Sequence, residues 1–325
     1  MDQRAYKRTL AKGIGKLEKK IKKEKHKCLI PDCSKTAIRS HSQQKEKQLR
    51  SIATDGCVYA MQRSIYQSIK NPDEPLIISK QGLSEASTFP GFCEKHDKDL
   101  FHPIDNSQIA ENSEQAFLIF MRSFCYEIAQ KRRGLKWMNG LIELLETLGN
   151  NNLREVEIMR DGIKHFTELD SVYYLDRLWA AYCSRNFEIV ETKWITANKN
   201  IGISSSCIFT PHVNAHELYE NYMCKGKPQP LLSFNVIPEQ QKSHIVISWF
   251  KEHAELTSWI KDRICSNDSI EEFVNYGAFA ESEDTCISPV VWESLSDEKK
   301  LSIKESMRHE LWRSELDKIP MIVSV

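Results

Sequence analysis

Two short stretches of the sequence bring together side chains that commonly bind metal ions. Residues 28–33, CLIPDC, form a Cys-x4-Cys pair, and residues 93–96, CEKH, form a Cys-x2-His pair. Two such pairs supply four sulfur and nitrogen ligands, which is the number and type that tetrahedral structural zinc sites use. Closing the chain between the pairs with an ion would stabilise a segment whose strands are short. We therefore predict a structural Zn²⁺ site formed by Cys28, Cys33, Cys93 and His96.

Two other interpretations of these side chains remain open. They could be ordinary buried cysteines with a surface histidine, which is what we expect of Cys57 and Cys125, since neither has a ligand-type neighbour at suitable spacing. Alternatively, Cys93 could be the nucleophile of a cysteine hydrolase, with a histidine as its base. Chelation accounts better for a cysteine and a histidine three residues apart at a turn.

His41 lies between the two pairs, and Asp97 directly follows the second pair. This order resembles the HNH, or ββα-metal, nuclease family, in which a zinc-binding pair precedes a catalytic histidine on a first strand and a second pair opens a helix. The resemblance covers about residues 28–108. It implies that His41 is the general base that activates water and that Asp97 binds a catalytic Mg²⁺ or Mn²⁺ ion.

That chemistry is physically reasonable for these residue types. A neutral imidazole with a pKa near ~6.5 accepts a proton at cellular pH, and a hard divalent cation neutralises charge on the scissile phosphate. The sequence also departs from the family. Ser40 replaces the acidic residue that usually precedes the base, and 52 residues separate His41 from Cys93, more than a compact finger needs.

The first 27 residues are strongly basic. They contain eleven Lys and Arg residues against three acidic ones, whereas the whole chain has 45 of each. An apolar stripe from Tyr6 to Ile21 has helical spacing, with lysines on the other face. This helix could dock on its own chain or on a partner, or it could bind phosphates, because lysines release counterions from nucleic acid. The candidate nucleic-acid contacts are Lys19, Lys20, Lys22, Lys23, Arg39 and Lys45.

The patterns along the chain predict an α+β protein. We expect a basic helical arm at 1–27, a zinc-stapled ββα-metal-like domain at 28–108, a helical segment at 109–183 and an α+β domain at 184–325. In the helical segment, apolar residues from Phe117 to Ile128 share one face and should be core. Four β-type runs between residues 187 and 250 predict an antiparallel sheet accompanied by helices.

The resemblance to the HNH family implies a metal-dependent endonuclease, with DNA favoured over RNA as substrate by analogy alone. The resemblance also suggests an effector subunit of a bacterial anti-phage defence system, with a protein partner encoded alongside. The alternative is a catalytically inactive, zinc-stapled module that binds nucleic acid or protein. No apolar run reaches the ~20 residues of a membrane span and the N-terminus lacks the apolar core of a secretory signal, so we expect a cytoplasmic protein with no membrane contact.

Overall fold

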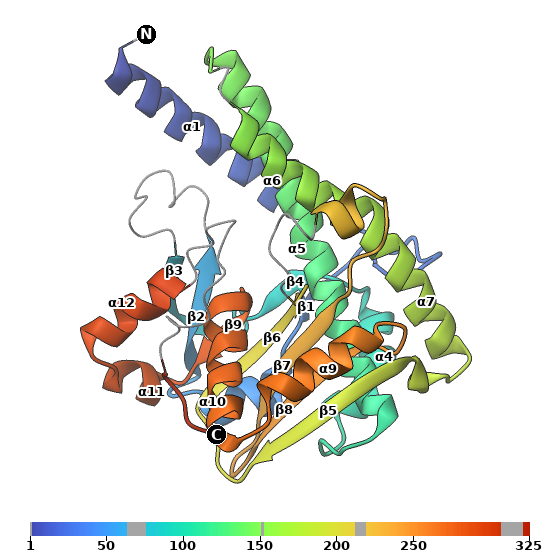
Figure 1. Cartoon of the computed structure of the whole chain (residues 1–325). Helices are drawn as coiled ribbons and strands as arrows, with labels where there is room; N and C mark the ends of the chain where they lie inside the picture. The colour runs from blue at the N-terminus through green and yellow to red at the C-terminus, as the bar shows by residue number, and fades with distance from the viewer. Residues whose placement is uncertain (1, 64–75, 151–152, 212–218, 307–320) are drawn as a thin grey trace.

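A computed structural model describes residues 2–63, 76–150, 153–211, 219–306 and 321–325 of the chain (Figure 1). Helices and strands are mixed, with a helical middle and an antiparallel sheet built mainly from the C-terminal part. The fold class predicted from the sequence is therefore confirmed.

The larger sheet has seven strands, all paired antiparallel, in the order β3-β2-β9-β6-β7-β8-β5. The strands are β2 (Cys57–Arg63), β3 (Leu76–Gly82), β5 (Val190–Ala197), β6 (Ile203–Phe209), β7 (Leu232–Pro238), β8 (Ser243–Phe250) and β9 (Thr285–Ile287). Strands β5 to β8 coincide with the four runs predicted from the sequence. Strands β7 and β8 form a hairpin in which Pro238 is opposite Ser243.

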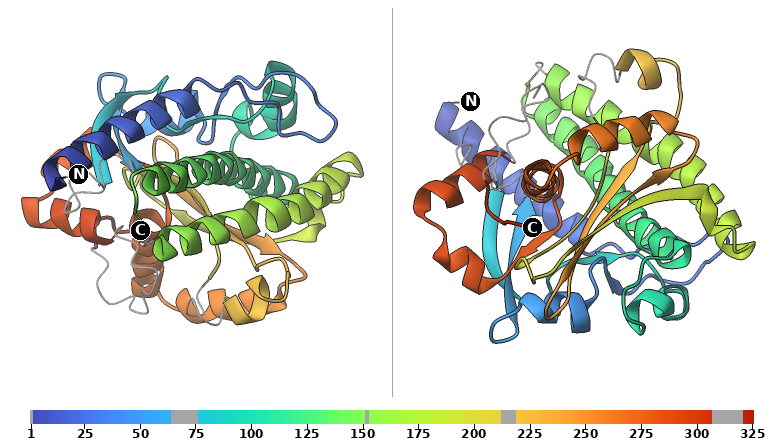
Figure 2. Two further views of the ribbon diagram at one scale, coloured as in Figure 1. Left: turned by 90° about the horizontal axis from the view of Figure 1, so that it is seen from above. Right: turned by 60° about the horizontal axis from the view of Figure 1, so that its bottom comes forward.

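Helices cover both faces of this sheet (Figure 2). The helices are α1 (Gln3–Lys22), α2 (Arg50–Ile52), α4 (Glu94–Asp105), α5 (Ser113–Thr147), α6 (Arg154–His165), α7 (Ser171–Cys183), α9 (Ala254–Arg263), α10 (Asn267–Tyr276), α11 (Pro289–Ser294) and α12 (Asp297–Ser306). Successive side chains of β8 point to opposite faces of the sheet, which gives a hydrophobic core on each face. Val246 belongs to the core under α5, whereas Ile245 and Ile247 face the core that α9 and α10 share.

The long helix α5 links the two ends of the molecule. Its first half packs on the sheet, and the predicted core residues from Phe117 to Ile128 are fully buried there. Its second half projects beyond the sheet and packs against α1 and α6 (Figure 1). The helices approach closely because Gly140 faces Leu17, where an added Cβ would lie 2.5 Å from a Leu17 methyl carbon. The apolar stripe of α1 is thus partly buried against α5.

A separate two-stranded ribbon precedes α4. Strand β1 (Arg39–His41) pairs antiparallel with β4 (Thr88–Pro90), and His41 is opposite Thr88. The β2–β3 hairpin is inserted between the two ribbon strands and joins the large sheet through β9. This insertion accounts for the long gap between His41 and Cys93. The proposed domain boundaries stay a prediction, but residues from the 28–108 segment and from the C-terminal half share one sheet.

A buried carboxylate lies at the start of α7. Asp170 is fully buried; its Oδ1 accepts the backbone N–H of Gln229 at 2.9 Å, and its Oδ2 has no hydrogen-bond partner. His165 Nε2 lies 3.8 Å from Oδ1. Burial raises the pKa of Asp170 to about 7, although the Gln229 hydrogen bond opposes the rise. Between pH ~4 and ~7 the native chain therefore holds a proton that the unfolded chain releases.

We expect this carboxyl to destabilise the chain as the pH rises. The native chain keeps the Asp170 proton up to the raised pKa, whereas the unfolded chain releases it near pH ~4. The free energy of unfolding therefore decreases as the pH rises from ~4 to ~7. Asp170→Asn removes this titration. Urea unfolding of both proteins at pH 5 and pH 8 should show the wild type losing on the order of 2 kcal/mol relative to the variant. An equal difference at both pH values would contradict the prediction.

Candidate metal centre and an adjoining polar site

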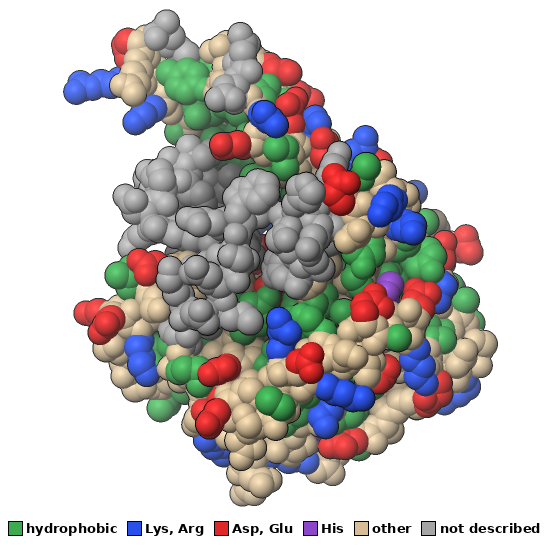
Figure 3. Space-filling model, viewed as in Figure 1, with side chains coloured by type: hydrophobic (Ala, Val, Ile, Leu, Met, Phe, Trp, Pro, Cys, Tyr) green, Lys and Arg blue, Asp and Glu red, His purple; other side chains and the backbone are tan. Residues whose placement is uncertain are grey.

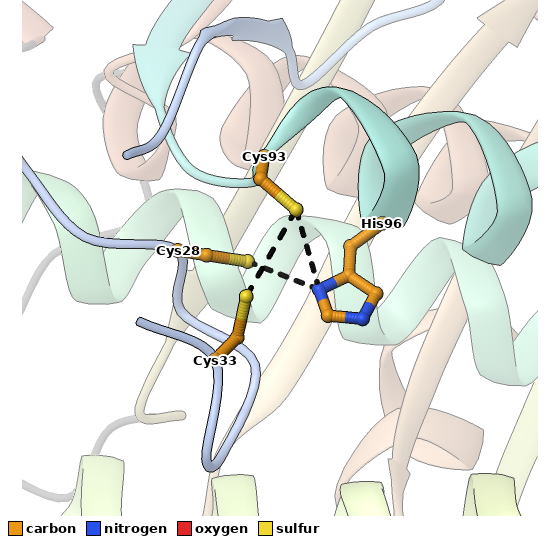
Figure 4. Close-up of side chains that lie close together, drawn as sticks. All are labelled: Cys28, Cys33, Cys93 and His96. Atoms are coloured by element: carbon orange, nitrogen blue, oxygen red, sulfur yellow. Dashed lines mark hydrogen bonds between the residues drawn. The ribbon is translucent and has the colours of Figure 1, made fainter. Parts of the chain in front are cut away.

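The two predicted ligand pairs converge at the start of α4 (Figure 4). The ligand atoms of Cys28, Cys33, Cys93 and His96 all lie within 4.8 Å of one another. His96 Nδ1 lies 3.3 Å from the sulfur of Cys28 and 3.5 Å from that of Cys93. The sulfurs of Cys33 and Cys93 are 3.9 Å apart.

Local backbone structure holds these four side chains in place. The Cys28 N–H donates to the Lys35 carbonyl and the Cys33 N–H donates to the Ile30 carbonyl, which closes a tight loop between the two cysteines. Asp32, inside that loop, has a positive φ of 61°. Cys93 is the N-cap of α4, and His96 follows in the first turn. Both Cys28 and Cys93 are buried in the core that surrounds α5.

These three separations match those of tetrahedral zinc coordination. Bonds of ~2.3 Å to sulfur and ~2.0 Å to nitrogen place two sulfurs about 3.8 Å apart and a sulfur and a nitrogen about 3.5 Å apart. The observed distances of 3.9 Å and of 3.3 to 3.5 Å agree. These residues could therefore bind a metal ion such as zinc, and the predicted ligand set is brought together in full.

The candidate ligands differ in how readily they ionise. Burial raises the pKa of the Cys28 thiol to about 11, because its charged form lies in a poorly solvated place. Burial also disfavours charge on Cys93, but hydrogen bonds from backbone N–H groups at the start of α4 and from the thiols of Cys33 and Cys28 outweigh it and lower the pKa of Cys93. Burial and the charges of Lys95 and Lys35 lower the pKa of His96, which keeps its imidazole neutral and able to bind a metal.

His41 is half-buried on β1, with a defined hydrogen bond. Its Nε2 lies 3.1 Å from the carbonyl oxygen of Leu83. A carbonyl oxygen only accepts, so Nε2 carries the proton and Nδ1 of the neutral ring keeps its lone pair. Burial lowers the pKa of His41 below its usual value, an effect that the Leu83 hydrogen bond opposes and the charge of Lys45 reinforces. The ring is thus neutral at pH 7 and able to accept a proton at Nδ1.

Asp97 lies one turn into α4, close to His41, and each charge influences the other. Burial raises the pKa of Asp97, whereas a hydrogen bond from Ser40 and the charge of Arg122 lower it. Arg122 is itself buried and makes two hydrogen bonds to Asp105, at 2.8 and 2.7 Å. The imidazole and the carboxylate that the sequence singles out therefore interact electrostatically.

The predicted basic contacts lie in different surroundings. Arg39 pairs with Glu85 at 2.5 Å, and Lys45 lies 3.4 Å from Glu46. All eleven Lys and Arg residues of the first 27 are exposed, including Lys19, Lys20, Lys22 and Lys23. Blue side chains project from α1 at the upper left of Figure 3.

The sequence alone assigns no role at the site to three polar residues, Ser40, Arg122 and Asp284. Ser40 stands where the family usually has an acidic residue, yet it is buried and accepts the N–H of Phe92 at 3.2 Å, and its hydrogen bond lowers the pKa of Asp97. Arg122 lies in a helix whose apolar pattern indicates only a hydrophobic core, and Asp284 is 243 positions from His41. A buried arginine within an apolar helical face was the one available hint, because it requires a buried partner.

No model of a known protein family, no curated protein and no solved structure matches the chain. Among the described helices, none combines the length and the apolar character that crossing a membrane requires.

We expect the purified protein to contain one zinc ion per chain. Cys33→Ser replaces a thiolate with a weak ligand, so zinc measured by plasma mass spectrometry should fall towards zero and the melting temperature should drop by more than about 5 °C. Cys57→Ser is the matched control, since Cys57 is a half-buried thiol outside the cluster. Equal zinc contents in the two variants would count against the site.

Proposed function

We propose that the chain is a metal-dependent endonuclease that resembles the HNH family and cleaves phosphodiester bonds in DNA. The observation that carries this proposal is that His41, on a strand, and Asp97, on the helix that begins at the cysteine cluster, influence each other's pKa through their charges. A structural Zn²⁺ at the cluster would hold the ribbon and α4 together. In this proposal His41 Nδ1 takes a proton from the attacking water.

Asp97 is the residue that would hold a catalytic Mg²⁺ or Mn²⁺ ion. Its carboxylate is a hard oxygen ligand, which is the type such cations prefer, and the bound ion would neutralise charge on the phosphate. Asp105 is already engaged by Arg122, which leaves Asp97 as the carboxylate next to His41. Ser40 occupies the position where the family usually has an acidic residue. In this proposal its hydroxyl orients Asp97 by a hydrogen bond.

The arm supports nucleic acid as the substrate class. A row of exposed lysines on α1 leads directly into residues 23–28 and so to the metal cluster. Such a surface attracts phosphates through counterion release, without reading sequence. DNA is proposed over RNA by analogy with the family. A cytoplasmic effector role in anti-phage defence, with a protein partner encoded alongside, extends the same proposal.

One observation favours a second function. Among the described residues, Asp105 is held in an ion pair by Arg122, which leaves Asp97 as the carboxylate identified beside His41, whereas catalytic divalent ions commonly have more than one protein ligand. A zinc-stapled module that binds nucleic acid or protein without cleaving it is therefore the competing proposal. The two differ in whether His41 is required for activity.

Cleavage of supercoiled plasmid with Mg²⁺ or Mn²⁺ tests the catalytic proposal. His41→Ala should lower the cleavage rate by about 10²-fold or more, because a general base contributes on that scale. His102→Ala serves as the matched control, since His102 is an exposed histidine on α4, the helix that also carries Asp97. Zinc content is measured in each protein, so that a lost metal is not mistaken for a lost base.

Cleavage retained by His41→Ala would refute the catalytic role of His41. Zinc-loaded wild type that binds DNA but cleaves neither DNA nor RNA with any divalent ion would favour the binding module.

The arm should contribute salt-dependent affinity. Replacing Lys19, Lys20, Lys22 and Lys23 by Gln should weaken binding of a 30-base-pair duplex, and the slope of log K against log salt should fall by roughly 0.9 for each lysine that contacts a phosphate. Fluorescence anisotropy in the His41→Ala background measures binding without cleavage. The control carries the same charge change at four exposed lysines elsewhere, Lys225, Lys251, Lys261 and Lys299. Equal slopes for both variants would exclude the arm.

A further inference from the structure

Asp284 is a buried carboxylate that the proposed chemistry does not use. It is 5% exposed and immediately precedes β9, a strand in the interior of the seven-stranded sheet. Its Oδ2 accepts hydrogen bonds from the hydroxyls of Ser42 at 2.5 Å and Ser87 at 3.0 Å. Its backbone carbonyl accepts the Gln43 side-chain amide at 2.6 Å. All of these donors come from the two segments that flank the β1–β4 ribbon.

Ser42 and Ser87 form the residue pair that follows the His41–Thr88 pair of the ribbon. Ser42 follows His41, and Ser87 precedes Thr88, the residue opposite His41. The Ser42 N–H donates to the Ser87 carbonyl at 2.9 Å, which extends the ladder by one step. Ser87 has a positive φ of 56°, a conformation that a residue with a side chain keeps only when its surroundings impose it. Asp284 supplies part of that constraint.

The ribbon needs an anchor of this kind. Each of its strands has three residues, and a two-stranded sheet of that size is marginal by itself. Burying a carboxylate is costly, and burial raises the pKa of Asp284 to about 6 against three opposing hydrogen bonds. Charge-assisted hydrogen bonds are stronger than neutral ones, so an ionised Asp284 restrains both serines more firmly than a neutral group could.

We propose that Asp284 is a positioning residue, which anchors the ribbon to the large sheet and thereby sets the orientation of His41. The proposal deepens the proposed function and rests on it for the role of His41. The cysteine cluster lies beyond the end of the ribbon where Arg39 pairs with Pro90, next to α4. Asp284 holds the opposite end, where His41 pairs with Thr88. A residue of the C-terminal half thus sets the geometry of a site built from the N-terminal half.

The test compares Asp284→Ala with Asp170→Ala in the full-length, zinc-loaded chain. Both variants remove a buried carboxylate, but the partners of Asp170 are Gln229 and His165, which lie outside the ribbon. Amide hydrogen exchange of residues 39–43 and 87–90 should accelerate at least about tenfold in Asp284→Ala and stay unchanged in Asp170→Ala. Nitrogen NMR of the His41 ring should change from one tautomer to a mixture, because the contact with Leu83 is loosened.

Conservative variants separate positioning from general stability. Asp284→Asn keeps one oxygen acceptor and should restore most of the exchange protection and the single tautomer. If Asp284→Ala fails to fold, Ser87→Ala removes one of the two serine hydroxyl bonds and should show the same changes at smaller size. Where wild type cleaves DNA, Asp284→Ala should lower kcat at least about tenfold with KM within about twofold.

The outcomes are distinct. Unchanged exchange and an unchanged tautomer in Asp284→Ala, or equal acceleration across the whole chain, would overturn the proposal. A wild-type protein without nuclease activity would instead remove the proposed function, and the exchange and NMR measurements would still decide whether Asp284 anchors the ribbon.

Discussion

The convergence of three thiols and one imidazole within 4.8 Å is the constraint on which the N-terminal part of the molecule depends. Ionised sulfurs at this distance repel one another, so the arrangement is favourable when a cation shares their charge. The ligands come from loops about 60 residues apart, and an ion between them closes that length of chain. Because Cys93 is also the N-cap of α4, the same contact sets the direction of the helix that carries Asp97.

A row of buried polar contacts, called here the polar seam, lies between the N-terminal part of the molecule and the rest of the fold. The Arg122–Asp105 pair, the serine contacts of Asp284 and the hydrogen bond of Ser40 lie in or beside an otherwise apolar interior. Buried polar groups are tolerated only when their partners are in place, so this seam restricts how the ribbon, α4 and α5 fit together. Apolar packing alone would permit sliding, whereas these directional bonds favour one register.

The proposed chemistry follows from that register. A backbone carbonyl determines which ring nitrogen of His41 is free, and burial keeps the ring neutral. Asp97 is oriented by Ser40 rather than by a second carboxylate. The inserted β2–β3 hairpin makes the ribbon and the large sheet continuous through β9, so the geometry around His41 depends on residues from both halves of the chain.

The sequence by itself determined the features that depend on local pattern. The four ligand residues were evident from their type and spacing, the strands from residue 187 to 250 from their runs of β-type residues, and the α1 and α5 stripes from helical spacing. Only the tertiary structure decided that β2 and β3 join the C-terminal sheet, that Ser40 holds Asp97, and that Asp284 reaches Ser42 and Ser87. Spacing reports neighbours along one helix or strand, whereas these contacts join residues from 57 to 242 positions apart through packing that no local pattern records.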